Sequence, residues 1–412
     1  IMWPFVSLES GLRERCLRDE AVLFGSSAMS GRPFRLMVIP SGIIGGVVWG
    51  CAASSGAPSS EQHGNATGDA SEIPAITAVD ASDARPDGDG TCSDDGWCIV
   101  DYPLDGDLTL VSLWGSSERD VWAVGSRGAI LHWDGSAWQP SNSGVDYAIR
   151  RVWGSGPGDV WAFSTLNGIL HSSGWVDGQA SWSPAAFSTT DDADGLTGVQ
   201  QTTPIVSVWG ASATDIYVGT LQVPGGSVWH MSGWNDGEPR WRPILEYLDY
   251  HGPVFGTAAT DIWVAGLNGK AANSQGYKSG IVDWTILDTG TRANLRGLWG
   301  GAHDDVWVVG DTGTIRHWTY DDDGELRWLV SESNVTRPLN AVWGSRPDDI
   351  WVVGEGNTVL HGDGESWSRS NIPSVIPAET RLFDVWGTAP DNVWIVGDNV
   401  ILNRRRPSEM SR

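Results

Sequence analysis

The chain has 412 residues, with 51 acidic against 26 basic side chains and a formal net charge of −25 at pH 7. Such an acidic balance excludes a basic surface for nucleic acid or anionic lipid. Hydrophobic residues make up 40% of the sequence and mean hydropathy is −0.20, which is ordinary for a globular fold. The unusual features are 26 tryptophans and 53 glycines, and they indicate the fold.

The first 51 residues contain signals for export. The chain begins with Ile1, and we predict that translation starts at Met29, so that residues 1–28 are upstream read-through. Residues 29–51 are typical of a signal peptide: Arg32 and Arg35 precede a mostly apolar stretch, 36–49, which is too short and too rich in glycine for a membrane-spanning helix.

The end of this signal, Val48-Trp49-Gly50-Cys51, resembles the lipobox of bacterial lipoproteins. The resemblance implies that Cys51 carries the lipid and becomes the mature N-terminus. The following Ala52 then implies an outer-membrane address. Plain secretion with cleavage nearby is the alternative. The expected location is therefore the outer membrane or the extracellular space, and the only membrane contact is through the lipid anchor.

Residues 52–91 predict a flexible linker, because they contain no aromatic residue and are rich in Ser, Ala, Gly, Pro and Asp. Asp87 and Asp89 suggest the start of a calcium loop. The match fails because Cys92 and Cys98 occupy the sixth and twelfth positions, where glycine and a bidentate acid are needed. We therefore predict no metal and no cofactor.

Cys92 and Cys98 bracket a short Ser-Asp-Asp-Gly-Trp segment. In an exported protein, two neighbouring cysteines with no others in the globular part predict a disulfide. A metal pair is the alternative, although no histidine lies near in sequence.

From residue 92 to 403 one pattern recurs seven times, as in Leu295–Trp318. An aromatic residue and glycine are followed, eight residues after the aromatic, by a second aromatic that is preceded by Asp or Asn and then Val or Ile. The pairs are Trp114–Trp122, Trp153–Trp161, Trp209–Tyr217, Phe255–Trp263, Trp299–Trp307, Trp343–Trp351 and Trp386–Trp394. Repeats of roughly 40 residues indicate a solenoid, a propeller or an array.

Two further markers complete each unit. A histidine follows the second aromatic in five units, and a lone Trp precedes the next unit. These residues are His132, His171, His230, His317 and His361, and Trp138, Trp182, Trp241, Trp284, Trp328 and Trp367. The segments between Gly and Asp punctuation are short and rich in Val, Ile and Trp, so one unit predicts four short antiparallel strands.

The second strand has two apolar faces. In the first unit, Val121 and Ala123 point to one face and Trp122 and Val124 to the other. A sheet that is apolar on both faces must be covered on both. Radial stacking of such sheets provides that cover, and the sequence therefore predicts an all-β, seven-bladed β-propeller.

The closure of the ring follows from a count of the markers. The last unit ends near Asn403 without its fourth-strand Trp, while Trp97 stands alone upstream of the first unit. We therefore predict that Trp97 supplies the outer strand of the last blade, within a domain of residues 92–403, and that 404–412 is a disordered tail. The Asp before each second strand is expected to cap a turn through backbone N–H groups rather than to act as an acid catalyst.

Irregular stretches at Ser183–Pro204, Thr220–Gly226 and Leu267–Ser279 are expected on one rim, in blades 2 to 4. This loop rim is formed by the second-to-third and fourth-to-first connections. Insertions gathered on one face are typical of a binding face, with neutral drift of exposed loops as the alternative. The residues expected to bind a ligand there are Arg127, Lys270, Asp311, Glu355 and Asp398.

The units Trp114–Trp138 and Trp343–Trp367 resemble Trp/Gly-rich secreted bacterial β-propellers of the BNR-like or sialidase-like kind and, more distantly, the tectonin repeats of sugar-binding propellers. The resemblance implies a propeller and not an activity. The segment His361–Trp367 is one residue short of the BNR Asp-box.

Three functions remain open. The first is a monomeric, non-catalytic module that binds glycan or protein through the loop rim of blades 2–4. The second is a glycoside hydrolase or sialidase-like enzyme, for which an axial arginine cluster would have to come from Arg150, Arg151, Arg296 and Arg381. The third is an envelope assembly scaffold. No nucleophile elbow, phosphate loop or zinc motif is present, so no catalytic residue is predicted.

Overall fold

The computed structural model describes residues 91–104, 106–189, 202–221, 226–248, 252–276 and 282–404. The predictions for the read-through segment, the signal peptide with Cys51, the linker up to residue 90 and the tail from 405 lie outside these residues. Within them, no helix has the length and apolar character needed to span a bilayer.

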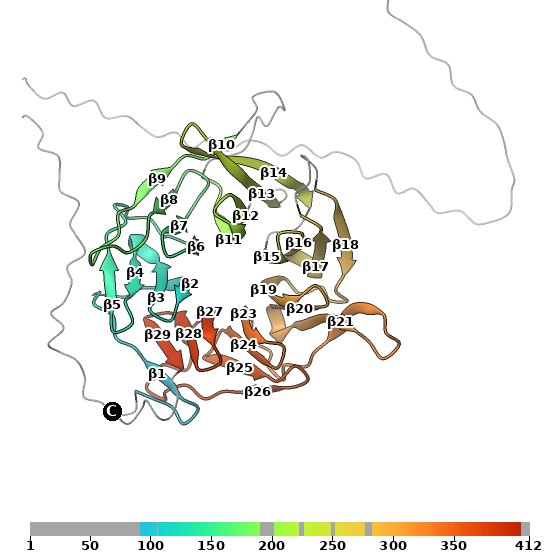
Figure 1. The fold of residues 1–412 in the computed structure, drawn as a ribbon. Coiled ribbons are helices and arrows are strands. Elements are labelled where there is room, and N and C mark those ends of the chain that lie inside the picture. Colours follow the sequence, from blue (N-terminus) through green and yellow to red (C-terminus); the bar gives the residue numbers. More distant parts are fainter. Residues whose placement is uncertain are drawn as a thin grey trace, which may run out of the picture. The chain divides into compact units, whose positions relative to one another are not determined.

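The described chain forms seven sheets arranged as a ring, which confirms the predicted seven-bladed β-propeller (Figure 1). The first three blades are built from β2 (Leu110–Ser117), β3 (Asp120–Gly125), β4 (Ile130–Trp133) and β5 (Trp138–Ser141); β6 (Arg151–Gly156), β7 (Asp159–Phe163), β8 (Ile169–Ser172) and β9 (Ser183–Ala185); and β10 (Ser188–Thr189), β11 (Ile205–Ser212), β12 (Asp215–Thr220), β13 (Gly226–Asn235) and β14 (Glu238–Leu248).

The other four blades continue round the ring. They are built from β15 (Val254–Ala258), β16 (Asp261–Ala265), β17 (Lys270–Ser274) and β18 (Trp284–Asp288); β19 (Leu295–Ala302), β20 (Asp305–Gly310), β21 (Ile315–Tyr320) and β22 (Leu326–Val330); β23 (Leu339–Arg346), β24 (Asp349–Gly354), β25 (Thr358–Gly362) and β26 (Trp367–Arg369); and β27 (Leu382–Ala389), β28 (Asn392–Gly397), β29 (Val400–Arg404) and β1 (Trp97–Ile99).

The ring is closed by its own leading strand, as predicted. Strand β1 pairs antiparallel with β29, with Trp97 opposite Arg404 and Ile99 opposite Leu402, so the two ends of the described chain meet in blade 7 (Figure 1). Trp97 is fully buried, and its ring lies edge-on to Trp351 of blade 6 at 5.2 Å. Its indole N–H donates to Oγ of Ser370 at 3.1 Å.

The same arrangement recurs inside the ring, which shows that Trp97 occupies a true repeat position. In blade 6 the fourth-strand Trp367 lies edge-on to Trp307 of blade 5 at 5.5 Å. Its indole N–H donates to Oγ of Ser331 at 2.8 Å. Closure therefore uses a contact that the repeat already contains.

The predicted disulfide is present between Cys92 and Cys98, immediately beside the closing strand. Asp95 lies between the two cysteines, and its carboxylate accepts from the backbone N–H of Asn371 at 2.5 Å and from Oγ of Ser370 at 3.3 Å. These contacts hold the segment before β1 against blade 6.

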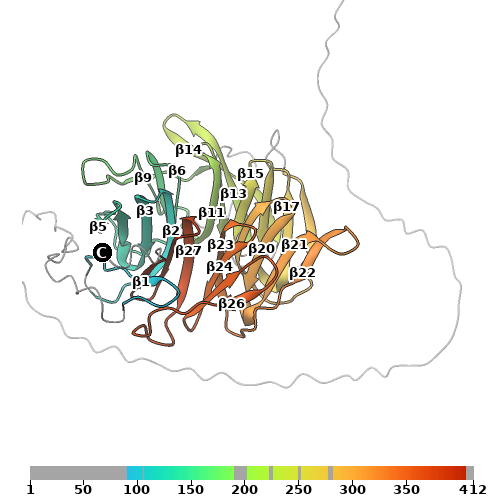
Figure 2. The same cartoon turned by 60° about the horizontal axis from the view of Figure 1, so that its bottom comes forward.

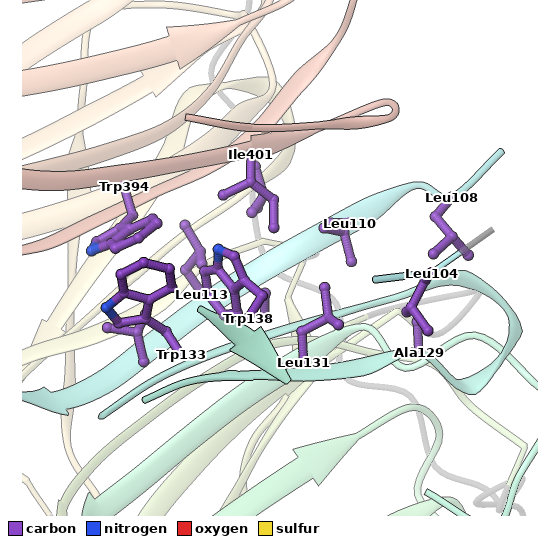
Figure 3. Packing of buried hydrophobic residues seen from close by; sticks show 13 residues of the cluster. Leu104, Leu108, Leu110, Leu113, Ala129, Leu131, Trp133, Trp138, Trp394 and Ile401 are labelled. Carbon is purple, nitrogen blue, oxygen red and sulfur yellow. The ribbon is translucent and has the colours of Figure 1, made fainter. Parts of the chain in front are cut away.

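Each sheet has apolar cores on both faces, as the alternation in β3 predicts. Val121 and Ala123 pack into a core with Trp394 of blade 7, which Figure 3 shows from close by. Trp122 and Val124 pack into a second core with blade 2. Because neighbouring blades share every core, the tryptophans stabilise the ring and not single sheets.

The Asp at the start of each second strand makes contacts that differ from the prediction of a turn cap. In blade 1, Asp120 accepts from the indole N–H of Trp122 at 3.1 Å and from Oγ of Ser116 at 2.5 Å, and Nε2 of His132 lies 2.8 Å from its Oδ1. Partial desolvation raises the pKa of Asp120, but the hydrogen bonds from His132 and Ser116 outweigh it and the net pKa is lowered. These partners are side chains from three strands, which sequence spacing alone did not reveal.

Two of the three irregular stretches are organised differently from the prediction. Ser183–Pro204 contains strand β9 and also β10, which pairs parallel with β14 and gives blade 3 a fifth strand. Leu267–Ser279 is not one long second-to-third loop, because a three-residue turn, η3 (Leu267–Gly269), leads directly into β17. The longer connection of blade 4 comes between β17 and β18, and its residues 277–281 lie outside the described part of the chain. Figure 2 shows the long hairpin of β13 and β14 standing out from its neighbours.

Candidate functional site: the central cavity and the loop rim

The Trp-Gly pair of each first strand joins neighbouring blades around the axis. A Cβ on Gly154 would lie 2.5 Å from Cη2 of Trp114, and one on Gly344 would lie 2.6 Å from Cη2 of Trp299. Glycine is therefore required because the preceding blade's indole covers it. The contact occurs in six pairs: Trp114 over Gly154, Trp153 over Gly210, Trp209 over Gly256, Trp299 over Gly344, Trp343 over Gly387 and Trp386 over Gly115.

This stacking creates an aromatic belt around a central cavity of about 380 Å³, which the first strands of all seven blades line. The belt consists of Trp114, Trp153, Trp209, Phe255, Trp299, Trp343 and Trp386. Polar side chains line the part of the cavity closer to the loop rim: in blade 2, Arg151 pairs with Phe163 at the end of β7, whereas Trp153 pairs deeper in the sheet with Trp161. The cavity is therefore polar toward one rim and aromatic toward the other.

Asp384 is the single carboxylate that lines this cavity among the described residues. It accepts from the backbone N–H of Leu113 at 2.8 Å and of Val385 at 3.0 Å, and so links blade 7 to blade 1. Desolvation raises its pKa to about 6, although the charge of Arg151 and the two N–H groups act in the opposite direction. Arg151 donates to the carbonyl oxygen of Arg150 at 2.7 Å and has a lowered pKa, mainly because its guanidinium is desolvated.

All five residues expected to bind a ligand lie in or beside second-to-third turns, on the loop rim. Arg127 lies in η2 (Ser126–Gly128), Lys270 begins β17, Asp311 begins η4 (Asp311–Gly313), and Glu355 and Asp398 lie in the turns after β24 and β28. Their position on this rim follows from the strand order; their role in binding stays a prediction.

Several of these residues are already engaged with arginines. Nε of Arg296 donates to Asp311 at 2.6 Å, and its Nη1 lies 4.0 Å from Glu355, so Arg296 brings these two acids together across blades 5 and 6. Asp398 forms an ion pair with Arg381 at 2.8 Å.

Arg127 lies apart from these ion pairs. Its Nη2 donates to the carbonyl oxygen of Asp107 at 3.0 Å. The side chain thereby connects the turn of blade 1 to the segment before β2, and it does so from a backbone at φ 55° that non-glycine residues seldom adopt.

Charge is distributed unequally between the two rims. Basic side chains gather in or beside the loop rim: Arg127, Arg150, Lys270, Arg292, Arg296, Arg337 and Arg381. A similar number of acids lie beside them, so this rim is mixed in sign: Asp107, Asp146, Asp288, Asp311, Glu332, Glu355, Glu379 and Asp398. Acids repeat on the opposite rim, at the start of second strands and in third-to-fourth turns: Asp120, Asp159, Asp215, Asp261, Asp305 and Asp349, and Asp134, Asp177, Asp236, Asp321 and Asp363. In a chain of net charge −25, the loop rim is thus the less acidic of the two rims and the better suited to an acidic partner.

Motif spacing did not identify the aromatic belt or the pair of Arg151 and Asp384 as parts of a site. The signal for the belt was the invariable glycine after each first-strand aromatic. A glycine at a fixed place in every repeat requires a close neighbour, but that neighbour lies one unit away in the chain. For Asp384 no signal exists in the repeat, because the other blades carry different residues at its position.

No protein-family model matches the chain, and no curated protein matches its sequence significantly. Solved structures do match its fold. YCF48 bound to D1 peptide aligns with a TM-score of 0.57 and 15% identity, over 76% of this chain and 98% of that one. YCF48 from Cyanidioschyzon merolae gives 0.56 and 17%, over 75% and 99%. The WD40 β-propeller domain of Doa1 gives 0.53 and 12%, over 77% and 100%.

At these identities the likeness concerns the fold alone. The chain is a seven-bladed β-propeller whose architecture is similar to that of YCF48 and of WD40 domains. The comparisons lend no support to the BNR-like or tectonin-like resemblance.

Proposed function

We propose that this propeller is a non-catalytic module that binds an acidic polypeptide segment on its loop rim, around the mouth of the central cavity. The observation that carries the proposal is that the basic side chains of a strongly acidic protein are concentrated on this rim, among its acids, and that one of them, Arg150, has no ion-pair partner among the described residues. A structural neighbour of the same architecture, YCF48, is known in complex with a peptide, which supports a polypeptide ligand.

Arg150 is the residue best suited to a first contact. It is exposed, it precedes β6 at the mouth of the cavity, and the described residues include no ion-pair partner for its side chain. Arg296 and Arg381, in contrast, are paired with Asp311 and Asp398. Charge-assisted hydrogen bonds to a partner carboxylate are each strong enough to dominate a small peptide interface.

A glycoside hydrolase receives less support from the same residues. Hydrolysis of a glycosidic bond uses two carboxyl groups that flank the bond. The described residues that line the central cavity provide one, Asp384, together with Arg151 and Arg296 and no tyrosine. We therefore propose binding without turnover.

The proposal can be tested by selecting random phage-displayed peptides against the full chain and titrating the enriched peptides. We expect enrichment of acidic peptides whose affinity falls with added salt. Arg150→Ala should weaken binding about tenfold, as expected for loss of one charged hydrogen bond. The matched control is Arg346→Ala, an exposed arginine in the β23–β24 turn of the opposite rim, which should bind like the wild type. Equal affinities of Arg150→Ala and the wild type, or selection of basic peptides, would contradict the proposal.

We also propose that the module is exported and anchored through lipid on Cys51, outside the described residues. The Cys92–Cys98 disulfide supports an oxidising compartment. Cys51→Ala should move the protein from the membrane to the soluble fraction. If the wild type is already soluble, plain secretion replaces the lipid anchor.

A further inference from the structure

On the rim opposite the loop rim, blade 4 departs from the repeat at its third strand. In blades 1, 2, 3, 5 and 6, the Asp that begins the second strand contacts a His from the third strand of the same blade. In blade 4 that third-strand residue is Asn273, which donates to Oδ1 of Asp261 at 2.8 Å. The histidine comes instead from blade 5: Nδ1 of His303, in the β19–β20 turn, lies 2.8 Å from the same oxygen.

Replacing a ring by an amide changes which side chains cover the second-strand tryptophan. Blade 7 has the same exchange, with Asn403 on its third strand, and there the ring of Trp133 of blade 1 lies 5.0 Å from that of Trp394 and is only 7% exposed. Trp318 of blade 5 holds the equivalent place beside Trp263, at 5.6 Å, but a space beside it stays open.

The result is a pocket of about 720 Å³ between blades 4 and 5, within the size range of small-molecule sites. Its accessible apolar wall comes from the half-buried Trp318 and Leu287, whereas Trp263, which also borders the pocket, is fully buried. The outer strand β18 and the residue before it contribute the exposed side chains of Thr285 and Asp283.

His303 lies where it could meet a ligand. Its side chain is 58% exposed although Asp261 fixes one ring nitrogen, so the imidazole is both accessible and held in orientation. Asn273 is half-buried behind it.

We propose that this pocket binds a neutral sugar residue. The C–H face of a sugar ring packs against an indole, while its hydroxyls both donate and accept hydrogen bonds. The pocket offers both partners: Asp283 accepts, and the hydroxyl of Thr285 can donate. The amide N–H groups of Asn273 already donate to Asp261 and to the carbonyl oxygen of Ile262, so its Oδ1 adds a second acceptor. An ammonium or guanidinium group has no acceptor, so it would leave the hydroxyl donor of Thr285 unused. The site is separate from the proposed peptide-binding rim and does not depend on it.

Saturation-transfer difference NMR on the full chain tests the proposal, with glucose, galactose, mannose, N-acetylglucosamine, cellobiose and lactose as probes and with lysine and choline as cationic probes. We expect at least one sugar to receive saturation and neither cation to do so. Titration of that sugar should show binding weakened at least about fivefold by Asp283→Asn, through loss of a charge-assisted hydrogen bond.

The matched control is Asp288→Asn, at the far end of β18, where the carboxylate is exposed and does not line the pocket. It should leave the affinity within about twofold of the wild type, less than the loss of one hydrogen bond. A second variant, Asn273→His with Trp318→Ser, gives blades 4 and 5 the side chains that His132 and Ser172 provide in blades 1 and 2. It should remove binding, because the Trp318 indole that lines the pocket is lost.

Three outcomes would overturn the proposal: no sugar binds, a cationic probe binds in place of the sugars, or Asp283→Asn and Asp288→Asn affect the affinity equally. Thermal unfolding shows whether the double variant is folded. If it is not, the comparison of Asp283→Asn with Asp288→Asn tests the proposal by itself.

Discussion

Gly344→Ala should destabilise the protein, although alanine normally gains stability over glycine where the backbone permits it. That gain is about 0.4–1 kcal/mol and arises because alanine reduces the conformational entropy of the unfolded chain. At Gly344, however, a Cβ would lie 2.6 to 3.0 Å from three atoms of the Trp299 ring. Trp299 is 8% exposed, so its ring cannot move aside without disturbing two blades. Overpacking of this kind costs about 1–3 kcal/mol, and the net effect is therefore a loss.

Urea unfolding of the variants measures this change. Gly156→Ala is the matched control, since Gly156 lies in the first strand β6 and a Cβ there meets nothing within 4 Å; it should be neutral or stabilising. Trp299→Phe should reduce the cost of Gly344→Ala, because blade 4 already has Phe255 at this position and the nearest atoms to a Cβ on Gly300 belong to other residues. If Gly344→Ala lowers stability equally in the wild-type and the Trp299→Phe backgrounds, the contact between the Trp299 ring and Gly344 does not cause the loss, and the reasoning is refuted.

Three further predictions concern the seam between the first and last blades. Trp97→Ala should lower the free energy of unfolding by about 3–5 kcal/mol. The control Trp234→Ala, at a side chain that is 41% exposed, should lower it by less than half of that. Similar losses for the two variants would show that Trp97 is not a core residue. The raised pKa of Asp384, about 6, means that the folded state binds this proton more tightly than the unfolded state. The free energy of unfolding of the wild type should therefore rise relative to that of Asp384→Asn as pH falls from 6 to about 4, by up to about 3 kcal/mol. If urea unfolding gives the two proteins parallel pH profiles, this prediction is wrong. Reduction of the Cys92–Cys98 disulfide should lower the free energy of unfolding by about 2 kcal/mol, because the bond closes a short loop in the unfolded chain. An unchanged thermal midpoint in the presence of reductant would argue against this stabilising role.

The fold could be predicted because its signals are local and periodic. The eight-residue offset between aromatics sets the first hairpin of every blade, and the unpaired Trp97 supplies the one strand that the last unit lacks. The alternation in β3 required two covered faces. Each of these inferences needs only residues within one unit, or a count of units.

The parts that sequence did not predict depend on contacts between units or between strands. Trp114 covers Gly154 in the next blade. The partners of Asp120 lie within its own blade but on three different strands, so their spacing along the chain did not reveal them. The fifth strand β10 pairs with β14 across a segment with no repeat pattern.

The blade 4 pocket depends on residues of two adjacent blades. Blade 4 has Asn273 in place of the third-strand His, and blade 5, the next blade, has a Trp directly after its own third-strand His, in His317-Trp318. A comparison of adjacent units, rather than of each unit with the average repeat, would have revealed this relation.

The most direct test of the ring is hydrogen–deuterium exchange of β29, residues 400–404, in the full chain. If β1 pairs with β29 as the structure has it, the carbonyl of Ile401 accepts from Val100 and β29 is an interior strand. Its amides should then exchange as slowly as those of β4, the third strand of blade 1. Rapid exchange of β29, as at an open sheet edge, would contradict closure by the N-terminal strand.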